Sequence, residues 1–333
     1  MNEKQAALMR QDRRVHTDLF YMCFPLLAMA VMFYGFRAAL LCGTAVITAN
    51  LCDRFVALLR RVPYEKREWS SEAFAFMLVL LMPATVSYYV VIVGTLAAVM
   101  IGKEAFGGYG SYPFHPTAVG YAVVAVSWPE QMFRYPDPAL FTPLPLGSTS
   151  GVTLVDSPLH VLKAGGLPTL DNTKLLLGNY AGPMGVTALL VLLACGLFLW
   201  NRRSIRLGVP ILFLLTCSVV AFVAPRLGDI PRFSLPWTYL SDRLEMMKYE
   251  MGSGGILFTA IFLVADPVTL PKTKAARAVY AVLLGFVTMM FRYYGNYETG
   301  VCFAMLAVNS ISGWLERTTQ RVLNRKGVVR REC

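Results

Sequence analysis

The sequence is poor in charge, in histidine and in paired cysteines. Asp, Glu, Lys and Arg together make up 15% of its 333 residues, whereas a soluble domain carries roughly 25%. Its seven cysteines include no CxxC pair and have no histidine cluster nearby, and only three histidines occur. We therefore expect neither a soluble domain, nor a disulfide framework, nor a zinc or iron–sulfur site held by this chain alone.

Apolar residues are abundant instead. They make up 56% of the chain, and the mean hydropathy is +0.52. They are gathered in continuous runs, whereas the strands of a membrane β-barrel alternate apolar and polar residues. The composition therefore predicts an all-α polytopic membrane protein. Its first run lacks a small-residue cleavage site, so we interpret it as a retained helix rather than a signal peptide.

About ten apolar runs are divided five and five by a long central loop. They cover about 19–36, 38–52, 71–85, 86–102 and 116–128, and then 181–200, 207–224, 254–266, 278–291 and 300–315. The expected domains are a cytoplasmic segment at 1–18, a first membrane half at 19–128, an outer loop at 129–177, a second membrane half at 178–316 and a basic cytoplasmic tail at 317–333.

The third run of each half is interrupted near its end. Pro83 lies in one of them and Asp266-Pro267 in the other. Matching interruptions in corresponding positions indicate an inverted repeat whose broken helices line a site. We therefore expect a five-plus-five inverted repeat of transmembrane segments.

The net charge of +11 lies in short basic clusters between the apolar runs. Such clusters set orientation in a membrane, and this placement argues against a nucleic-acid partner. With the N-terminus inside, 22 Lys and Arg residues lie on the inner side and 9 on the outer side. The count predicts that both termini are cytoplasmic and that the central loop faces outward.

A glycine-rich motif follows the fourth run. Residues 102–116 read Gly-Lys-Glu-Ala-Phe-Gly-Gly-Tyr-Gly-Ser-Tyr-Pro-Phe-His-Pro. Glycines supply turns with positive φ and let the backbone approach a ligand closely, but a tight connection between broken helices fits these residue types equally well. Three further motifs are Gly-Asn-Tyr-Ala-Gly-Pro-Met-Gly at 178–185, Ala-Asp-Pro-Val-Thr-Leu-Pro at 265–271 and Arg-Tyr-Tyr-Gly-Asn-Tyr-Glu-Thr-Gly at 292–300.

In this order the motifs resemble the D subunit of the Rnf complex and the related B subunit of the sodium-pumping NADH:quinone oxidoreductase. The short N-terminal extension favours the Rnf subunit. The resemblance implies a redox subunit, not catalytic alone, in a bacterial inner-membrane complex with the other Rnf subunits. That complex couples electron transfer between ferredoxin and NAD+ to translocation of Na+ or H+. This chain carries no dinucleotide fingerprint of its own after a strand.

The resemblance also implies two flavins. One is FMN, which a flavin transferase joins through its phosphate to a threonine in a Ser/Thr-Gly-Ala-Thr motif on an outer loop. Ser150-Gly151-Val152-Thr153 matches three of the four positions, so Thr153 is the expected attachment residue. An ordinary solvated turn would fit the same residue types.

The other implied flavin is a riboflavin held non-covalently within the membrane. Glycines of the glycine-rich motif, Gly107, Gly108 and Gly110, are the candidate flavin contacts. Departures from the usual family pattern are Val152 for Ala and Gly147 for Asp near the attachment motif. In the glycine-rich motif, Tyr112 and His115 replace Asn, and Thr117 replaces Ala.

Two carboxylates near broken helices are candidates for an ion path. A charged group at bilayer depth costs about 2.5–3.5 kcal/mol on insertion scales, so Glu104 and Asp266 are functional candidates by default. An interfacial carboxylate paired with Lys103, or a helix cap, is the other interpretation. We expect His115, a lone histidine beside prolines, to be a hydrogen-bonded turn residue, and Arg292 with its tyrosines to form an interfacial belt.

A non-redox channel or transporter remains the alternative function. The fold implied by the resemblance is similar to that of urea and ammonium channels, and a five-plus-five pattern by itself would fit one. Flavin fluorescence on the purified chain would distinguish the two functions.

Overall fold

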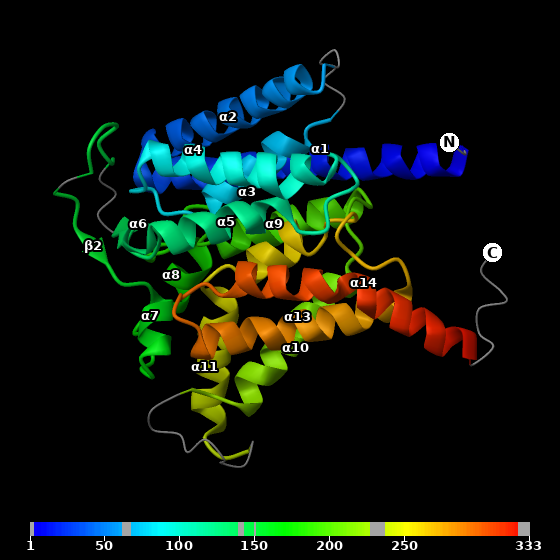
Figure 1. Cartoon of the computed structure of the whole chain (residues 1–333). Coiled ribbons are helices and arrows are strands. Elements are labelled where there is room, and N and C mark those ends of the chain that lie inside the picture. Colours follow the sequence, from blue (N-terminus) through cyan, green and yellow to red (C-terminus); the bar gives the residue numbers. More distant parts are fainter. Residues whose placement is uncertain (1–2, 62–67, 139–142, 150, 227–236, 326–333) are drawn as a thin grey trace.

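The chain folds into a bundle of helices (Figure 1). The computed structural model describes residues 3–61, 68–138, 143–149, 151–226 and 237–325, with side chains from residue 14 to 324 within these ranges. Over these ranges helices dominate, and the strands form a single ribbon of two short segments. The prediction of an all-α polytopic fold is confirmed.

The first half contributes five helical spans. They are α1 (Glu3–Tyr34), α2 (Arg37–Leu59), α3 (Ser70–Leu80), α4 (Tyr88–Leu96) with a π-helical continuation (Ala97–Lys103), and α5 (Pro116–Ser127). Each coincides with a predicted apolar run. The chain is not helical between α3 and α4, where Pro83 lies, because proline lacks an amide hydrogen and clashes with the preceding turn.

The second half also contributes five helical spans. They are α9 (Leu189–Asn201), α10 (Gly208–Val223), α12 (Ile256–Phe258) with a π-helical continuation (Thr259–Leu263), α13 (Lys274–Tyr294) and α14 (Val301–Arg325). The expectation of a helix over 181–200 is wrong at its start. The helix begins only at Leu189, and residues 181–188 are a buried non-helical segment.

Both halves therefore contain a short third helix that ends before a proline. All side chains of α3 are buried, as are those of the π-helix that follows α12. The unwound backbone after α3 pairs with the buried segment before α9: Met184 N donates to the carbonyl of Met82 (3.0 Å) and Gly185 N to that of Leu80 (2.8 Å). Irregular backbone at membrane depth is tolerated where such partners satisfy it.

A side chain on Gly185 would obstruct this crossing. A Cβ built there would lie 2.6 Å from the Cβ of Leu80, which is closer than packed side-chain atoms allow. Glycine at 185 is therefore required by the close approach of the two halves, which gives one of the motif glycines a structural reason.

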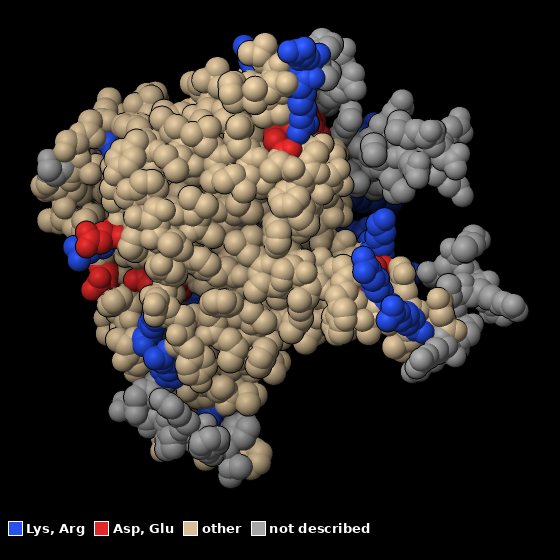
Figure 2. Space-filling model, viewed as in Figure 1, with Lys and Arg blue, Asp and Glu red and all other residues tan. Residues whose placement is uncertain are grey.

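The dimensions and surface fit a membrane protein. Within the part of the chain that the structure describes, four helical stretches are long and apolar enough to cross a bilayer: Arg14–Tyr34, Arg37–Leu59, Tyr88–Phe106 and Lys274–Tyr294. Four shorter apolar helices, including α3 and α9, accompany them. Figure 2 shows a broad uncharged surface with charged side chains gathered toward its margins.

The two ends of the bundle differ. The start of α1 and the end of α14 lie at one end, and the strands with α6 (Pro129–Met132) and α7 (Pro158–Lys163) lie at the other (Figure 1). We call the former the terminal end and the latter the loop end. The opposite placement of termini and central loop is the arrangement that the charge count predicts.

The loop end carries short elements that the apolar pattern did not indicate. Strand β1 (Tyr135–Pro136) pairs antiparallel with β2 (Leu154–Val155), and α8 (Asn172–Leu177) follows α7. A further helix, α11 (Leu240–Gly252), occupies part of the polar segment between α10 and α12. The hydroxyl of Tyr249 on α11 donates to the carbonyl of Leu170 (2.8 Å), so α11 holds the later part of the central loop.

Candidate functional site

The segment before the attachment motif is anchored by one buried arginine. Arg37, at the first position of α2, is 2% exposed. Its Nη1 donates to the carbonyls of Pro145 (2.9 Å), Leu146 (3.2 Å) and Gly147 (2.6 Å). Its Nε and Nη2 donate to Ala84 (2.9 Å) and Val86 (3.0 Å) in the break between α3 and α4. One guanidinium therefore ties the central loop to the broken helix.

Within the candidate attachment motif, Gly151 and Thr153 are exposed. Val152 N donates to the carbonyl of Thr149 (3.2 Å), and Gly151 has φ +95°, a conformation that favours glycine. Thr153 follows this turn directly before β2, and its side chain is exposed. Ser150 lies outside the described residues, so its predicted contribution to recognition stays a prediction.

Nearby hydroxyls differ from Thr153 in their surroundings. The hydroxyl of Thr149 is partly buried and donates to the carbonyl of Thr85 (3.4 Å), whereas no hydrogen bond within the described part of the chain holds the hydroxyl of Thr153. At Gly147, where the family usually has Asp, an added Cβ would have no heavy atom within 4 Å. The geometry at 147 therefore leaves room for a carboxylate beside Arg37.

A cleft opens beside the β1–β2 ribbon at the loop end. It has a volume of about 580 Å³, and its lining includes Phe133, Arg134, Asp156 and Tyr297. The rings of Phe133 and Tyr297 are stacked with centroids 5.3 Å apart. Asp156 follows Thr153 by three residues, so the cleft is close to the attachment motif along the chain. The cleft therefore combines aromatic rings with basic and acidic side chains, among them Lys163 and Glu130.

One buried carboxylate of this cleft fixes α7. Glu298 accepts a hydrogen bond from Ser157 Oγ (2.6 Å), and its Oε1 lies 3.2 Å from Nδ1 of His160. Ser157 in turn caps α7 by accepting from the amide of His160 (3.1 Å). Burial raises the pKa of Glu298 above its ordinary value, against the lowering effect of Ser157 and His160.

The glycine-rich motif forms a turn at the terminal end. Gly107, Gly108 and Gly110 all have positive φ, and Gly108 N donates to the carbonyl of Lys103 (3.2 Å). An added Cβ at Gly108 would lie 3.5 Å from the carboxylate oxygens of Glu104. The turn alone accounts for glycine at these positions, and their contact with a flavin stays a prediction.

Glu104 lies in a polar network at the same end. Its carboxylate is 3.2 Å from Nη1 of Arg60 and 3.6 Å from Nζ of Lys103. Lys103 is buried and also pairs with Glu68 (2.9 Å), while its Nζ donates to Ser71 Oγ (2.8 Å). The predicted pairing of Glu104 with Lys103 is therefore present. No contact between described side chains joins Glu104 to Asp266.

Asp266 lies in a separate buried cluster. Its Oδ1 is 3.3 Å from His16 Nε2 and accepts from the hydroxyl of Tyr112 (3.3 Å) and from Val268 N (3.3 Å). His115 is buried nearby, and neither ring nitrogen has a hydrogen-bond partner among the described residues. The expectation of a hydrogen-bonded turn histidine is therefore wrong, because the surrounding side chains exclude solvent and place Phe74 against the ring.

Arg292 also differs from expectation. Its side chain is buried, its Nε lies 2.5 Å from Glu250 Oε2, and its Nη2 donates to the carbonyl of Ser253 (3.1 Å). It is therefore not part of an interfacial belt, because α11 brings a carboxylate to it. Tyr294, in contrast, is 74% exposed, as an interfacial tyrosine would be.

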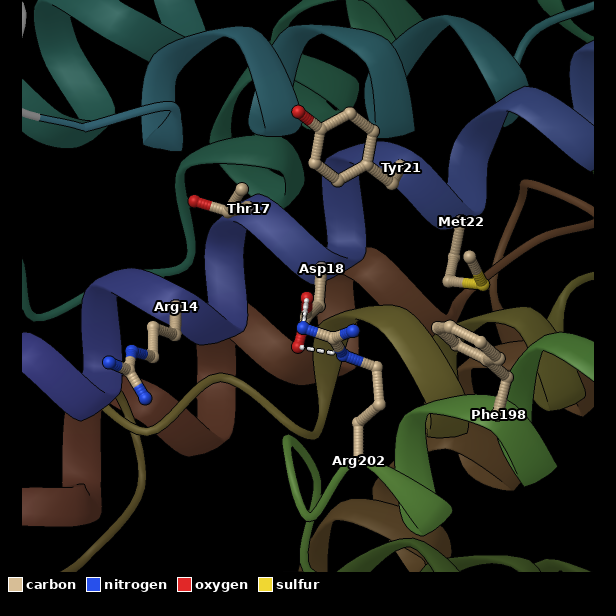
Figure 3. A pocket seen from close by; sticks show the side chains of 7 residues that line it. All are labelled: Arg14, Thr17, Asp18, Tyr21, Met22, Phe198 and Arg202. Atoms are coloured by element: carbon tan, nitrogen blue, oxygen red, sulfur yellow. Dashed lines mark hydrogen bonds and ion pairs between the residues drawn. The ribbon is translucent and has the colours of Figure 1, made fainter.

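The two halves are also tied together at α1. Figure 3 shows Asp18 of α1 paired with Arg202 at the end of α9, and their side chains are 3.1 Å apart. Arg14 points into the same pocket, which has a volume of about 420 Å³. Asp18 and His16 both lie on α1. Through Arg202 and Asp266, respectively, they join α1 to the second half at two polar contacts.

Sequence reasoning singled out neither Arg37 nor His16. Arg37 lies between the first two apolar runs, where it is one of the nine outer basic residues of the charge count, and an arginine at that depth has to find partners. His16 lies among basic residues before the first run, and its signal was weak: it is one of only three histidines. The partners of both residues lie far away in the sequence: Arg37 binds the carbonyl of Gly147, and His16 contacts Asp266.

Comparison with known proteins assigns the family. A family model described as NQR2, RnfD, RnfE matches residues 6–324. The D subunit of the ion-translocating oxidoreductase complex of Yersinia pseudotuberculosis is 29% identical over 345 residues, covering 93% of each chain. The D subunit of the proton-translocating ferredoxin:NAD(+) oxidoreductase complex of Clostridium ljungdahlii is 26% identical over 327 residues, covering 94% of this chain and 92% of the relative. The match runs through nearly the whole chain, and the protein therefore belongs to the NQR2, RnfD, RnfE family.

Proposed function

We propose that the protein is a flavin-carrying membrane subunit of an Rnf-type complex that couples ferredoxin:NAD+ electron transfer to ion translocation. The names of its relatives support this assignment, since they describe the D subunits of ion-translocating oxidoreductase complexes. Its partners are then the other subunits of such a complex, in the inner membrane of a bacterium. In this orientation the terminal end faces the cytoplasm and the loop end faces outward.

The observation that carries the flavin assignment is the setting of Thr153. Its side chain is exposed, directly after a glycine turn and directly before β2. The preceding segment is held by Arg37 through the carbonyl of Gly147. A hydroxyl that an enzyme modifies has to be accessible on a positioned loop, and Thr153 meets this requirement.

The residues around Thr153 fit a flavin phosphoester. In this proposal Oγ1 of Thr153 bonds to the phosphorus of FMN, and Ser150 and Gly151 shape the segment that the flavin transferase recognises. The nearby cleft also carries the aromatic side chains of Phe133 and Tyr297, which stack on one another, and Tyr297 stacks on Phe303 as well. A bound flavin supplies the one- and two-electron redox chemistry, and the protein contributes position and electrostatics.

The ion path and the second flavin belong to the terminal end in this proposal. Glu104 and Asp266 are the carboxylates of the path, and each follows a π-helix that continues and ends a short α-helix. Such π-helical segments occur frequently at functional sites. The turn of Gly107, Gly108 and Gly110 is the proposed contact of a non-covalent riboflavin.

The mass of the purified chain tests the flavin assignment. Co-expressed with a flavin transferase, the wild-type chain should gain the mass of one FMN less one water, and Thr153→Val should not. Thr149→Val is the matched control, because the hydroxyl of Thr149 is partly buried and already bonded. It should keep the adduct, and Ser150→Ala should weaken labelling without abolishing it.

Two outcomes would contradict this assignment. An adduct that persists in Thr153→Val would place the attachment elsewhere. A wild-type chain that purifies colourless, without flavin, beside an active transferase would reject the flavin-carrying function and favour the channel.

A further inference from the structure

A buried polar cluster joins three segments that are far apart in the sequence. His16 of α1 and Asp266, after the second π-helix, are both 0% exposed, and His16 Nε2 lies 3.3 Å from Asp266 Oδ1. Tyr112, from the glycine-rich segment, donates to the same Oδ1 (3.3 Å) and lies 3.5 Å from His16 Nε2. These contacts bring both membrane halves to one carboxylate oxygen.

His115 adds a buried base to this cluster. Both of its ring nitrogens, and Oδ2 of Asp266, are buried without a hydrogen-bond partner among the described residues. The ring of Phe74 packs edge-on against both His115 and His16, with centroids 5.2 Å apart in each case. Leaving buried polar atoms unpaired is costly, and the unpaired atoms here belong to an imidazole and a carboxylate, two groups that can take up a proton.

We infer that His16, Tyr112, His115 and Asp266 form a proton-binding site, and that its ligand is H+ and not Na+. The place of this site on an ion path rests on the proposed function. Proton binding itself is a property of the chain and can be measured without the rest of the complex.

The charge balance of the cluster explains why it would bind a proton. A carboxylate that is fully buried needs a compensating charge, and no Lys or Arg among the described residues forms an ion pair with Asp266. One proton shared between His16 Nε2 and Asp266 Oδ1 leaves the pair neutral whichever atom carries it. A second proton has an acceptor nitrogen on His115, where burial and His16 disfavour the charged form and Asp266 favours it. Moving a proton between these atoms changes only N–H and O–H bonds.

The other titratable groups around the cluster are acids and phenols. Tyr109 Oη lies 3.4 Å from His16 Nδ1. Tyr280 of α13 is within electrostatic reach of Asp266, and Glu68 is within reach of Tyr112. None of these described groups brings a fixed positive charge.

The same set of atoms is unsuited to Na+. Hard cations are bound by several oxygen ligands, from carboxylates, carbonyls and water. Here two of the four side chains offer ring nitrogens, and Oδ1 of Asp266 already accepts from several donors. Within the described residues, no group of three or more His, Cys, Asp and Glu side chains is placed to hold a metal ion.

Nitrogen NMR of the full-length chain with ¹⁵N-labelled histidine tests the inference. The chain has three histidines, and the third, His160, lies exposed at the loop end, where it serves as an internal reference. His160→Asn and His115→Asn assign the signals. We expect His115 to take up a proton reversibly in the folded chain as the pH is lowered. Asp266→Asn should shift the signals of His16 and His115 but not that of His160.

Exchange of Na+ for K+ at constant pH and ionic strength provides the second arm. We expect no change in the signals of His16 or His115. Tyr112→Phe removes the hydroxyl that contacts both Asp266 and His16 with little change of volume, so it should shift the same two signals even if Asp266→Asn fails to fold. A saturable, Na+-dependent shift at His16 or His115 would overturn the inference, and so would a His115 that never binds a proton in the folded chain.

Ion transport by the assembled complex in vesicles separates this inference from the proposed function. His115→Asn should lose proton uptake while ferredoxin-driven electron transfer in detergent persists. A complex without any electron transfer would contradict the proposed function and leave the proton-binding measurement standing. Wild-type proton uptake in His115→Asn would remove His115 from the path.

Discussion

The guanidinium Nη1 of Arg37 donates a 2.6 Å hydrogen bond to the carbonyl of Gly147, across 110 residues of sequence. The same side chain reaches Ala84 and Val86 in the broken third segment. The position of the segment before the candidate attachment motif is therefore coupled to the unwound core of the first half. Arginine suits this place because its planar fork holds several acceptors in fixed directions.

Arg37→Gln should detach the loop before Thr153. Hydrogen bonds to charged groups contribute about 1.5–3 kcal/mol each, and several carbonyls lose their donor together, so we expect a loss of at least about 3 kcal/mol of stability. Hydrogen exchange should rise at residues 143–149, and the thermal midpoint in detergent should fall. Arg317→Gln, at an exposed position on α14, is the control. Unchanged exchange at 143–149 would show that Arg37 does not anchor the loop.

Gly147→Asp should be tolerated. A Cβ there meets no heavy atom within 4 Å, and the new carboxylate would lie beside a buried cation. We expect a change in thermal stability equivalent to about 0.5 kcal/mol or less, as for an ordinary surface substitution. Gly185→Ala is the contrast, because its Cβ would meet Leu80 at 2.6 Å; overpacking there should cost about 1–3 kcal/mol. An equal loss of thermal stability in Gly147→Asp and Gly185→Ala would contradict the packing described at these two positions.

Labelling of single cysteines tests which end faces outward. The six described native cysteines are all buried, so a Cys333→Ser background suffices. Ser148→Cys lies exposed at the loop end and Lys272→Cys exposed at the terminal end. An impermeant thiol reagent added to intact cells should label the first, and the second only after lysis. The reverse pattern would invert the orientation that the basic residues predict.

The stability contributed by Glu298 should depend on pH. Because burial raises its pKa, the folded chain binds this proton more tightly than the unfolded chain does. The contribution is complete below the ordinary glutamate pKa of about 4.3, and it is lost as pH rises through the raised value. In Glu298→Gln, the thermal midpoint should therefore fall less steeply as the pH is raised. Glu245→Gln, at an exposed acid on α11, should keep the wild-type slope.

Much of the fold could be predicted because the apolar runs are local signals. The runs around α1, α2, α13 and α14 predicted helices, and Pro83 predicted the break after α3. The run before α9 misled because residues 181–188 are apolar for another reason: they are buried against the unwound backbone near Leu80. Apolar composition reports burial, and it does not by itself distinguish a helix from a buried extended segment.

The candidate site could be predicted only in part. The position of Thr153 on an accessible loop followed from Gly and Ser residues near it, which are typical of turns. The partners of Asp266 could not be found in this way. His16, Tyr112 and Asp266 come from three separate segments, and only the packing of α1 across the two halves brings them together.

The backbone hydrogen bonds between the two halves also bear on how the chain is made. The carbonyls of Leu80 and Met82 are synthesised well before their donors, Gly185 and Met184. At ribosomal rates of about 5–20 residues per second, the interval is roughly 5–20 s. During that time the nascent first half holds unpaired carbonyls at membrane depth, where they are costly. We therefore expect the third segment to complete its insertion only when the second half arrives, and a fragment that ends in the central loop to be degraded faster than the full chain.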